Sequence, residues 1–201
     1  EIFSRFIPEK AFLEILLPAL QHIGKLWYQG EASVQQEHFA SALLVQRLYT
    51  FIGASPPPTR PEKIIVGCPP EEEHDLSLLF LNLFLRRRGF KVVNLGRNVP
   101  LEKFKETAIL VAPEIIILAA QQLTTAATLE EISREFVGTD IPVAYSGRFF
   151  QSTPETKDYI HGHFLGTEML NTFAVIEKLF KEDTPNAYAL PENKFEELYA
   201  S

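Results

Sequence analysis

A histidine with carboxylate neighbours stands between a strand-like and a helix-like segment. His74 lies in the run Cys-Pro-Pro-Glu-Glu-Glu-His-Asp-Leu-Ser at residues 68–77, which follows the apolar residues 64–67. Open α/β sheets bind their ligands at the carboxyl ends of strands, so this position suits a ligand-binding side chain. Nearby carboxylates can fix the tautomer of an imidazole and strengthen it as a metal ligand. The segment therefore indicates either a ligand to a metal or metal-bearing cofactor, or a solvated histidine in an acidic loop.

A second histidine pair, in the segment His161-x-His163, has the spacing of two metal ligands on adjacent loop positions. It lacks a cysteine or carboxylate partner at a suitable spacing, which a structural metal site requires. We therefore expect these residues to form a surface loop.

The composition is typical of a globular protein. The chain has 201 residues, of which 46% are hydrophobic and 22% charged, enough to bury one or two cores. No apolar run approaches the roughly 20 residues that span a bilayer, and the first residues lack a signal-peptide pattern. We therefore expect no membrane contact and a cytoplasmic location. The net charge of −7 argues against nucleic-acid binding by this chain itself.

The first 52 residues predict a helical block. Apolar side chains recur at helical spacing up to Trp27, although Pro18 should kink that helix. A second helix should begin at Ser33, whose spacing from Gln36 matches a capping box. Two helices bury little apolar surface on their own. Either they pack on the rest of the chain or other helices preceded residue 1, which is not Met and so is compatible with a fragment of a longer protein.

The remaining sequence predicts an α/β domain. Residues 53–62 form a proline-rich linker, which should be extended and fairly stiff. Beyond it strands and helices alternate over residues 63–182, and continuous apolar strands favour a parallel sheet covered on both faces. We predict a doubly wound, flavodoxin-like sheet of five strands. The strands are expected near residues 63–68, 91–96, 114–119, 141–145 and 163–165, and the helices near 75–88, 101–111, 126–136, 154–160 and 167–182. The tail, residues 183–201, is assigned no role.

Two motifs together carry a family resemblance. Trp27 is followed after nine residues by Glu37-His38 in the helical block, and Glu72-x-His74 opens the α/β domain. This combination resembles the cobalamin-binding part of the CarH family, the light-dependent MerR-type transcriptional repressors. The similarity covers most of residues 8–182. Segments 143–149 and 162–166 resemble the late glycine-containing loops of that family, and the helical block resembles part of a four-helix bundle.

The resemblance implies adenosylcobalamin as the cofactor and assigns the site residues. His74, with Glu72 beside it, would bind the cobalt from below and displace the base of the nucleotide tail. Trp27, Glu37 and His38 would cover the adenosyl group. Taken singly, Trp27 is more typical of a core aromatic and Glu37-His38 of a solvated helix face, but their shared spacing favours the binding role. The freed tail would enter a groove lined by small residues. These are Ser77, Ala119, Ser146, Gly147 and Gly166.

Four positions depart from the family pattern. Ser77 and Ser146 stand where the family has glycine, and Ala119 stands where it has serine. Tyr28 replaces a histidine that in some members captures the cobalt from above after illumination. The upper site would then be left to a tyrosine or to water.

Three classes of function remain. The first is a sensor in which light breaks the cobalt–carbon bond of bound adenosylcobalamin and changes the assembly state. The dark form would be a tetramer. DNA would be bound only through a domain absent from this chain. The second is an interaction module that has lost the cofactor, which the departures keep open. The third is a corrinoid carrier of methyl groups. Because a carrier must leave the upper face open, Trp27 with Glu37-His38 favours the sensor. We expect no catalytic residues and no enzymatic activity, since no hydrolase set or glycine-rich phosphate loop is present.

Overall fold

The computed structural model describes residues 7–166 and 169–180, which fall into two compact units. The helical unit comprises residues up to Pro57 together with Leu79–Gly89, and the sheet unit comprises Pro58–Leu78 and the residues from Phe90 on. We describe each unit by itself. The tail predicted over 183–201 lies outside the described residues, as do residues 167–168 and 181–182 of the last predicted helix.

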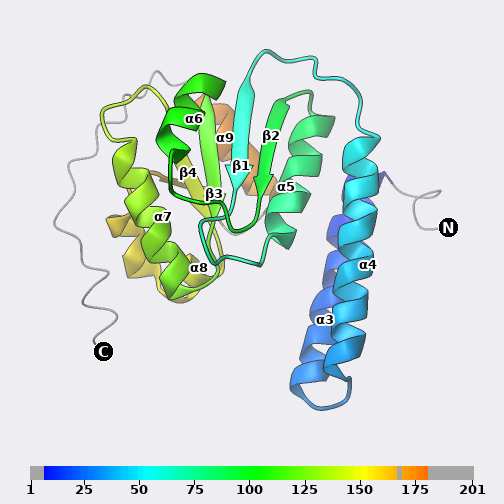
Figure 1. Cartoon of the computed structure of the whole chain (residues 1–201). Coiled ribbons are helices and arrows are strands. Elements are labelled where there is room, and N and C mark those ends of the chain that lie inside the picture. Colours follow the sequence, from blue (N-terminus) through cyan, green and yellow to red (C-terminus); the bar gives the residue numbers. More distant parts are fainter. Residues whose placement is uncertain (1–6, 167–168, 181–201) are drawn as a thin grey trace. The chain divides into compact units, whose positions relative to one another are not determined.

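Helices make up the helical unit, and two of them form an antiparallel hairpin (Figure 1). A π-helical segment, Phe12–Leu16, precedes Pro18, where we expected a kink, and there the N–H of Leu17 donates to the carbonyl of Phe12. Proline cannot donate a hydrogen bond within a helix, and such π-helical turns are one way in which helices accommodate an irregularity. The elements are α2 (Pro8–Ala11), the π-helix, α3 (Leu17–Tyr28), α4 (Val34–Gly53) and most of α5 (Leu76–Arg87).

Helix α4 begins where the sequence predicts. The backbone N–H of Gln36 donates to the Ser33 hydroxyl at 3.2 Å, and the N–H of Ser33 donates to the Gln36 side chain at 2.8 Å. These two bonds satisfy N–H groups that a helix start otherwise leaves unpaired. The predicted capping box is therefore confirmed.

A small aromatic cluster forms the core of the helical unit. The Phe12 ring packs edge-on against Phe51 and Phe80, with centroids 5.7 Å and 5.2 Å apart. At the end of α5, Arg87 pairs with Glu9 at 2.6 Å. Much apolar surface of α3 and α4 stays exposed. The large exposed side chains on these two helices are those of Trp27, Tyr28, Val34, Phe39, Leu43 and Tyr49.

Five parallel strands form the sheet unit in the order β2-β1-β3-β4-β5. The direction of strand order reverses at β1, so β1 and β3 flank the topological switch point at which doubly wound sheets bind ligands. This arrangement confirms the predicted flavodoxin-like fold. The strands are β1 (Lys63–Gly67), β2 (Lys91–Gly96), β3 (Ile115–Ala119), β4 (Val143–Ser146) and β5 (His163–Phe164).

Alternating strand residues face two covering layers. Ile65, Ile116 and Tyr145 belong to the buried cluster that α6 (Phe104–Val111) and α7 (Leu123–Glu135) share. Figure 1 shows α9 (Met169–Leu179) on the opposite face of the sheet. This two-sided cover explains why the strands are apolar throughout.

Helix boundaries differ from the prediction in three places. Helix α6 starts three residues later than expected, and α7 starts three residues earlier because the N–H of Gln122 donates to Thr125, which caps the helix at that point. The expected helix at 154–160 is the 3-10 helix Pro154–Tyr159. A short helix before it, α8 (Phe149–Ser152), was not predicted.

Candidate cofactor site

A buried carboxylate organises the loop that carries His74. Glu72 is fully buried, and its Oε1 atom accepts hydrogen bonds from the backbone N–H of His74 at 3.0 Å and from its Nδ1 at 2.8 Å. The other oxygen, Oε2, accepts from the N–H of Gln121 and from the hydroxyl of Thr125, both at 2.7 Å. Gln121 follows β3 and Thr125 lies in α7. The carboxylate therefore joins the ends of β1 and β3 at the switch point.

These hydrogen bonds also favour the ionised form of Glu72 and set which ring nitrogen of His74 faces it. Burial raises the pKa of Glu72, but the bonds from Thr125, Gln121 and His74 outweigh it, and the net pKa is lowered. An ionised carboxylate only accepts hydrogen bonds, so Nδ1 of His74 carries the proton. In the neutral ring, Nε2 then keeps its lone pair, and 65% of the His74 side chain is exposed. This is the arrangement in which a carboxylate orients a histidine that binds a metal.

The loop backbone is held by the residues that follow β2. The N–H of Glu71, which has a positive φ of 65°, donates to the Asn98 side chain at 2.9 Å, and the N–H of Asn98 donates to the carbonyl of Glu72 at 3.1 Å. Cys68 begins this loop and is buried, and burial raises the pKa of its thiol to about 12. This supports a core thiol rather than a nucleophile.

Three of the predicted groove residues meet at adjacent strand ends. Ala119 is buried at the end of β3 and lies in register with Ser146 at the end of β4. Gly147 has a φ of +143°, and a Cβ there would stand 1.7 Å from the carbonyl oxygen of Ala120. Only glycine fits that position. Gly166, with a φ of +80°, follows β5, and exposed Ser77 lies in the first turn of α5.

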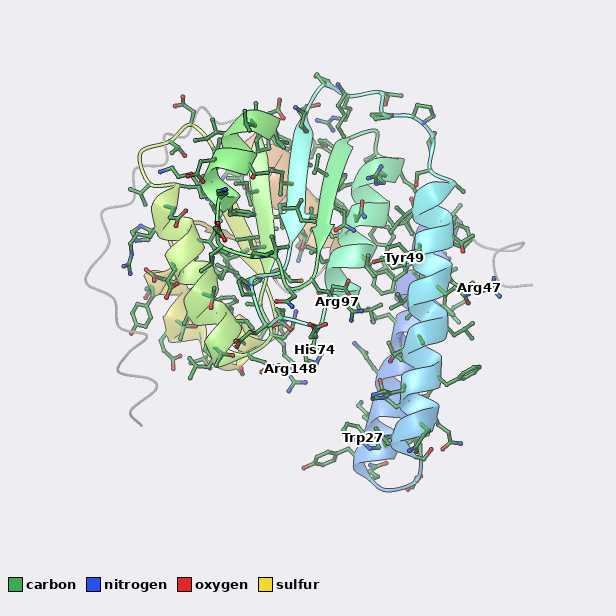
Figure 2. All side chains as sticks on the ribbon, in the orientation of Figure 1. Trp27, Arg47, Tyr49, His74, Arg97 and Arg148 are labelled. Atoms are coloured by element: carbon green, nitrogen blue, oxygen red, sulfur yellow. The ribbon has the colours of Figure 1, made fainter. Side chains whose placement is uncertain are left out.

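The residues predicted to cover the adenosyl group belong to the helical unit. Trp27 is 48% exposed near the end of α3 (Figure 2). Glu37 accepts hydrogen bonds from Ser41 at 2.6 Å and from Nδ1 of His38 at 2.9 Å, and the His38 side chain is 75% exposed. His74 lies in the other, sheet unit.

The chemistry of the donors decides what kind of metal site His74 could serve. Among the described residues, no group of three or more histidine, cysteine, aspartate or glutamate side chains could hold a metal ion. A bare ion needs several protein ligands. One oriented histidine instead fits a cofactor that brings most of its metal ligands with it, as a corrin ring does.

Sequence reasoning missed Gln121 and Thr125. Both bind Glu72 across about fifty residues of chain, a contact that only the parallel pairing of β1 with β3 creates. The spacing of Thr125 from Gln122, which resembles a capping box, was the one available signal for it.

Comparison with known proteins places this arrangement in a family. A sequence model described as a B12 binding domain matches residues 62–172, and a second of that description matches residues 1–50. The chain belongs to the B12-binding domain family. It is a cobalamin-binding family, and the oriented His74 of this B12-binding domain fits its cofactor.

Within the described residues, no helix is both long and apolar enough to cross a bilayer.

Two curated relatives are transcriptional repressors of Myxococcus xanthus. The HTH-type transcriptional repressor CarH is 34% identical over 131 residues, which are 65% of this chain and 44% of CarH. The repressor CarA is 34% identical over 105 residues, 52% of this chain and 34% of CarA. The B12-binding domain thus spans less than half the length of either relative. The predicted resemblance to the CarH type is confirmed.

Solved structures share the fold at low sequence identity. The monomethylamine corrinoid protein of Methanosarcina barkeri matches with a TM-score of 0.69 and 12% identity over 86% of this chain and 84% of its own. The methanol:cobalamin methyltransferase complex MtaBC from the same organism matches with 0.56 and 19%, over 92% and 72%. A cobalamin-binding protein of Desulfitobacterium hafniense DCB-2 matches with 0.53 and 16%, over 86% and 92%.

Proposed function

We propose that this B12-binding domain binds adenosylcobalamin and senses light for a transcriptional regulator. The observation that carries the proposal is His74, whose Nδ1 is held by the buried Glu72 while 65% of its side chain stays exposed. Bound adenosylcobalamin would supply a cobalt–carbon bond that visible light breaks. Identity to two repressors supports a regulatory role over an enzymatic one.

The lower half of the proposed site lies in the sheet unit. Nε2 of His74 binds the cobalt, and Glu72 keeps the ring in the required tautomer and orientation. The nucleotide tail lies along the carboxyl edge of the sheet. Its groove is lined by Ser77, Ala119, Ser146, Gly147 and Gly166.

The upper half lies in the helical unit. The half-exposed indole of Trp27 packs against the adenosyl group, and Glu37 and His38 bind its polar atoms. Loss of these contacts on illumination shifts the assembly from a tetramer in the dark to smaller species, because a ligand shifts an equilibrium through its differential contacts. A domain outside this chain would bind DNA, and the regulator would act in the cytoplasm.

A corrinoid carrier of methyl groups is the second candidate, favoured by the fold shared with the monomethylamine corrinoid protein. Cofactor preference separates the two functions. A sensor should retain adenosylcobalamin over methylcobalamin, because Trp27 and His38 contact the adenosyl group. A carrier should bind methylcobalamin at least as well.

Reconstitution in the dark tests the proposed function. Protein loaded with adenosylcobalamin should give a base-off, histidine-bound spectrum, and green light should change both that spectrum and the mass measured by light scattering after size exclusion. Failure to retain any cobalamin would overturn the proposal. Identical masses before and after a demonstrated bond cleavage would leave cofactor binding in place but remove the assembly switch.

A further inference from the structure

Hydrogen bonds connect His74 to the backbone of a second basic residue, Arg148, at the same edge of the sheet. The backbone N–H of Arg148, just after β4, donates to Oε1 of Gln121 at 2.8 Å. The N–H of Gln121 donates to Glu72, which holds His74. The loops after β1, β3 and β4 are thereby joined, and Figure 2 shows His74 and Arg148 at this edge. The imidazole of His74 and the backbone that carries the Arg148 side chain are thus held in one network.

The backbone of Arg148 is anchored on both sides. Before it, Gly147 lies against the carbonyl of Ala120 in a conformation that only glycine adopts. After it, buried Phe150 packs against Tyr145 with ring centroids 4.8 Å apart. A side chain on so fixed a backbone loses less freedom when it binds a ligand than one on a mobile loop.

The guanidinium of Arg148 is exposed and, within residues 7–166 and 169–180, has no carboxylate partner. Four other arginines of that part of the chain are paired with carboxylates. They are Arg60 with Glu62 and Glu177, Arg87 with Glu9, Arg97 with Glu73, and Arg134 with Glu130. In a chain with a net charge of −7, an unpaired cation at the ligand-binding edge is available for an anion from outside.

We propose that Arg148 binds the phosphate of the cofactor's nucleotide tail and so distinguishes complete cobalamin from a corrinoid that lacks the tail. This inference rests on the proposed function. The tail of cobalamin contains one phosphodiester, which carries a single negative charge. A guanidinium can form two parallel hydrogen bonds to such a group, and a lysine ammonium cannot reproduce that geometry.

Two ligands and three variants test the proposal. Dissociation constants for adenosylcobalamin and adenosylcobinamide, which lacks the phosphate and base, are measured in darkness for the parent protein, Arg148→Gln and Arg148→Lys. The control is Lys91→Gln, because Lys91 is exposed at the amino end of β2, away from the carboxyl edge, and its loss removes the same charge. Arg148→Gln should weaken cobalamin binding about tenfold and leave cobinamide binding unchanged. Arg148→Lys should give a smaller loss, and Lys91→Gln should preserve the parent's ratio of the two constants.

Salt dependence gives an independent readout. Because part of the affinity comes from a charge pair, cobalamin binding by the parent should weaken as salt is raised, and Arg148→Gln should flatten that dependence. Equal losses for both ligands in Arg148→Gln, or no loss for either, would overturn the assignment. If the parent protein itself binds neither ligand, the proposed function fails, which is a different result.

Discussion

The two halves of the proposed site are built in contrasting ways. The half that carries His74 is fixed before any ligand arrives, because the buried Glu72 binds His74 in its own loop and Gln121 and Thr125 after β3. The half that carries Trp27 and His38 is largely exposed, and His38 makes a hydrogen bond with its neighbour Glu37. In the proposed site, the sheet unit would supply affinity through preorganisation, while the residues of the helical unit would become ordered only by binding the ligand.

Removal of His74, the proposed cobalt ligand, should have the largest effect. His74→Ala should weaken the retention of adenosylcobalamin by about a hundredfold or more and abolish the histidine-bound spectrum, since an alanine side chain offers no nitrogen to the cobalt. Dark titration monitored by absorption measures both. The exposed His38→Ala is the control and should keep the spectrum. An unchanged spectrum in His74→Ala would contradict the assignment.

Removing the support of His74 should have the next largest effect. Glu72→Gln places an amide NH₂ where the carboxylate accepts hydrogen bonds, so we expect a loss of about 10- to 100-fold in cofactor affinity. The free energy of unfolding without cofactor should fall by about 1–3 kcal/mol. Glu73→Gln, at an exposed neighbour that pairs with Arg97, serves as the matched control for urea denaturation. Equal stabilities of the two variants would mean that the buried network does not organise the loop.

The lowered pKa of Glu72 has a defined consequence for acid stability. A carboxyl group whose folded pKa lies below its unfolded value stabilises the fold above the unfolded value of about 4.5, and this contribution is lost as the pH falls through the folded pKa. Urea denaturation of the parent should therefore show stability falling in this acid range. Glu72→Gln should remove that part of the dependence, and an unchanged slope would contradict it.

Replacement of Trp27 in the helical unit should have a smaller effect, confined to cofactor selectivity. Trp27→Ala should reduce the preference for adenosylcobalamin over methylcobalamin by about tenfold with little change in stability, because aromatic packing against a ligand is a local contribution. Tyr49 in α4 is exposed to the same extent, at 49% against 48% for Trp27, and Tyr49→Ala is the matched control. If the parent binds both cobalamins equally, the role given to Trp27 is wrong.

The smallest effect concerns His161, which we expected in a surface loop. The structure corrects this: His161 is 9% exposed, and its Nδ1 has no hydrogen-bond partner among the described residues. Its backbone N–H donates to Ser133 of α7, which draws the loop against that helix. Burial, with the nearby charge of Arg134, lowers the pKa of His161.

This lowered pKa predicts a pH dependence in the sheet unit that does not involve the cofactor. The unfolded chain binds a proton near pH 6.5 and the folded chain only at lower pH, so stability should fall as the pH drops below about 6.5. Urea denaturation of His161→Gln should show a flatter dependence than the parent in this range. Equal slopes would show that another group is responsible.

Local patterns predicted the fold better than they predicted the site. Apolar runs such as residues 115–118 located the strands, and their two-sided burial made a parallel sheet the natural solution. His74 could be found from its place after β1. The residues that hold Glu72 could not, because Gln121 and Thr125 approach it only through the pairing of β1 with β3. The burial of His161 was hidden for the same reason, since it depends on a distant helix.

Gly147 has a consequence for how the sequence of this domain can drift. The family resemblance expects glycine at both 146 and 147, yet this chain has replaced only the first. Position 146 is an ordinary strand residue that tolerates a side chain, whereas a methyl group at 147 would collide with the carbonyl of Ala120. Position 146 can therefore change during evolution, which would reshape the proposed groove, while position 147 must stay glycine. A library randomised at both positions would return variety at 146 and glycine at 147.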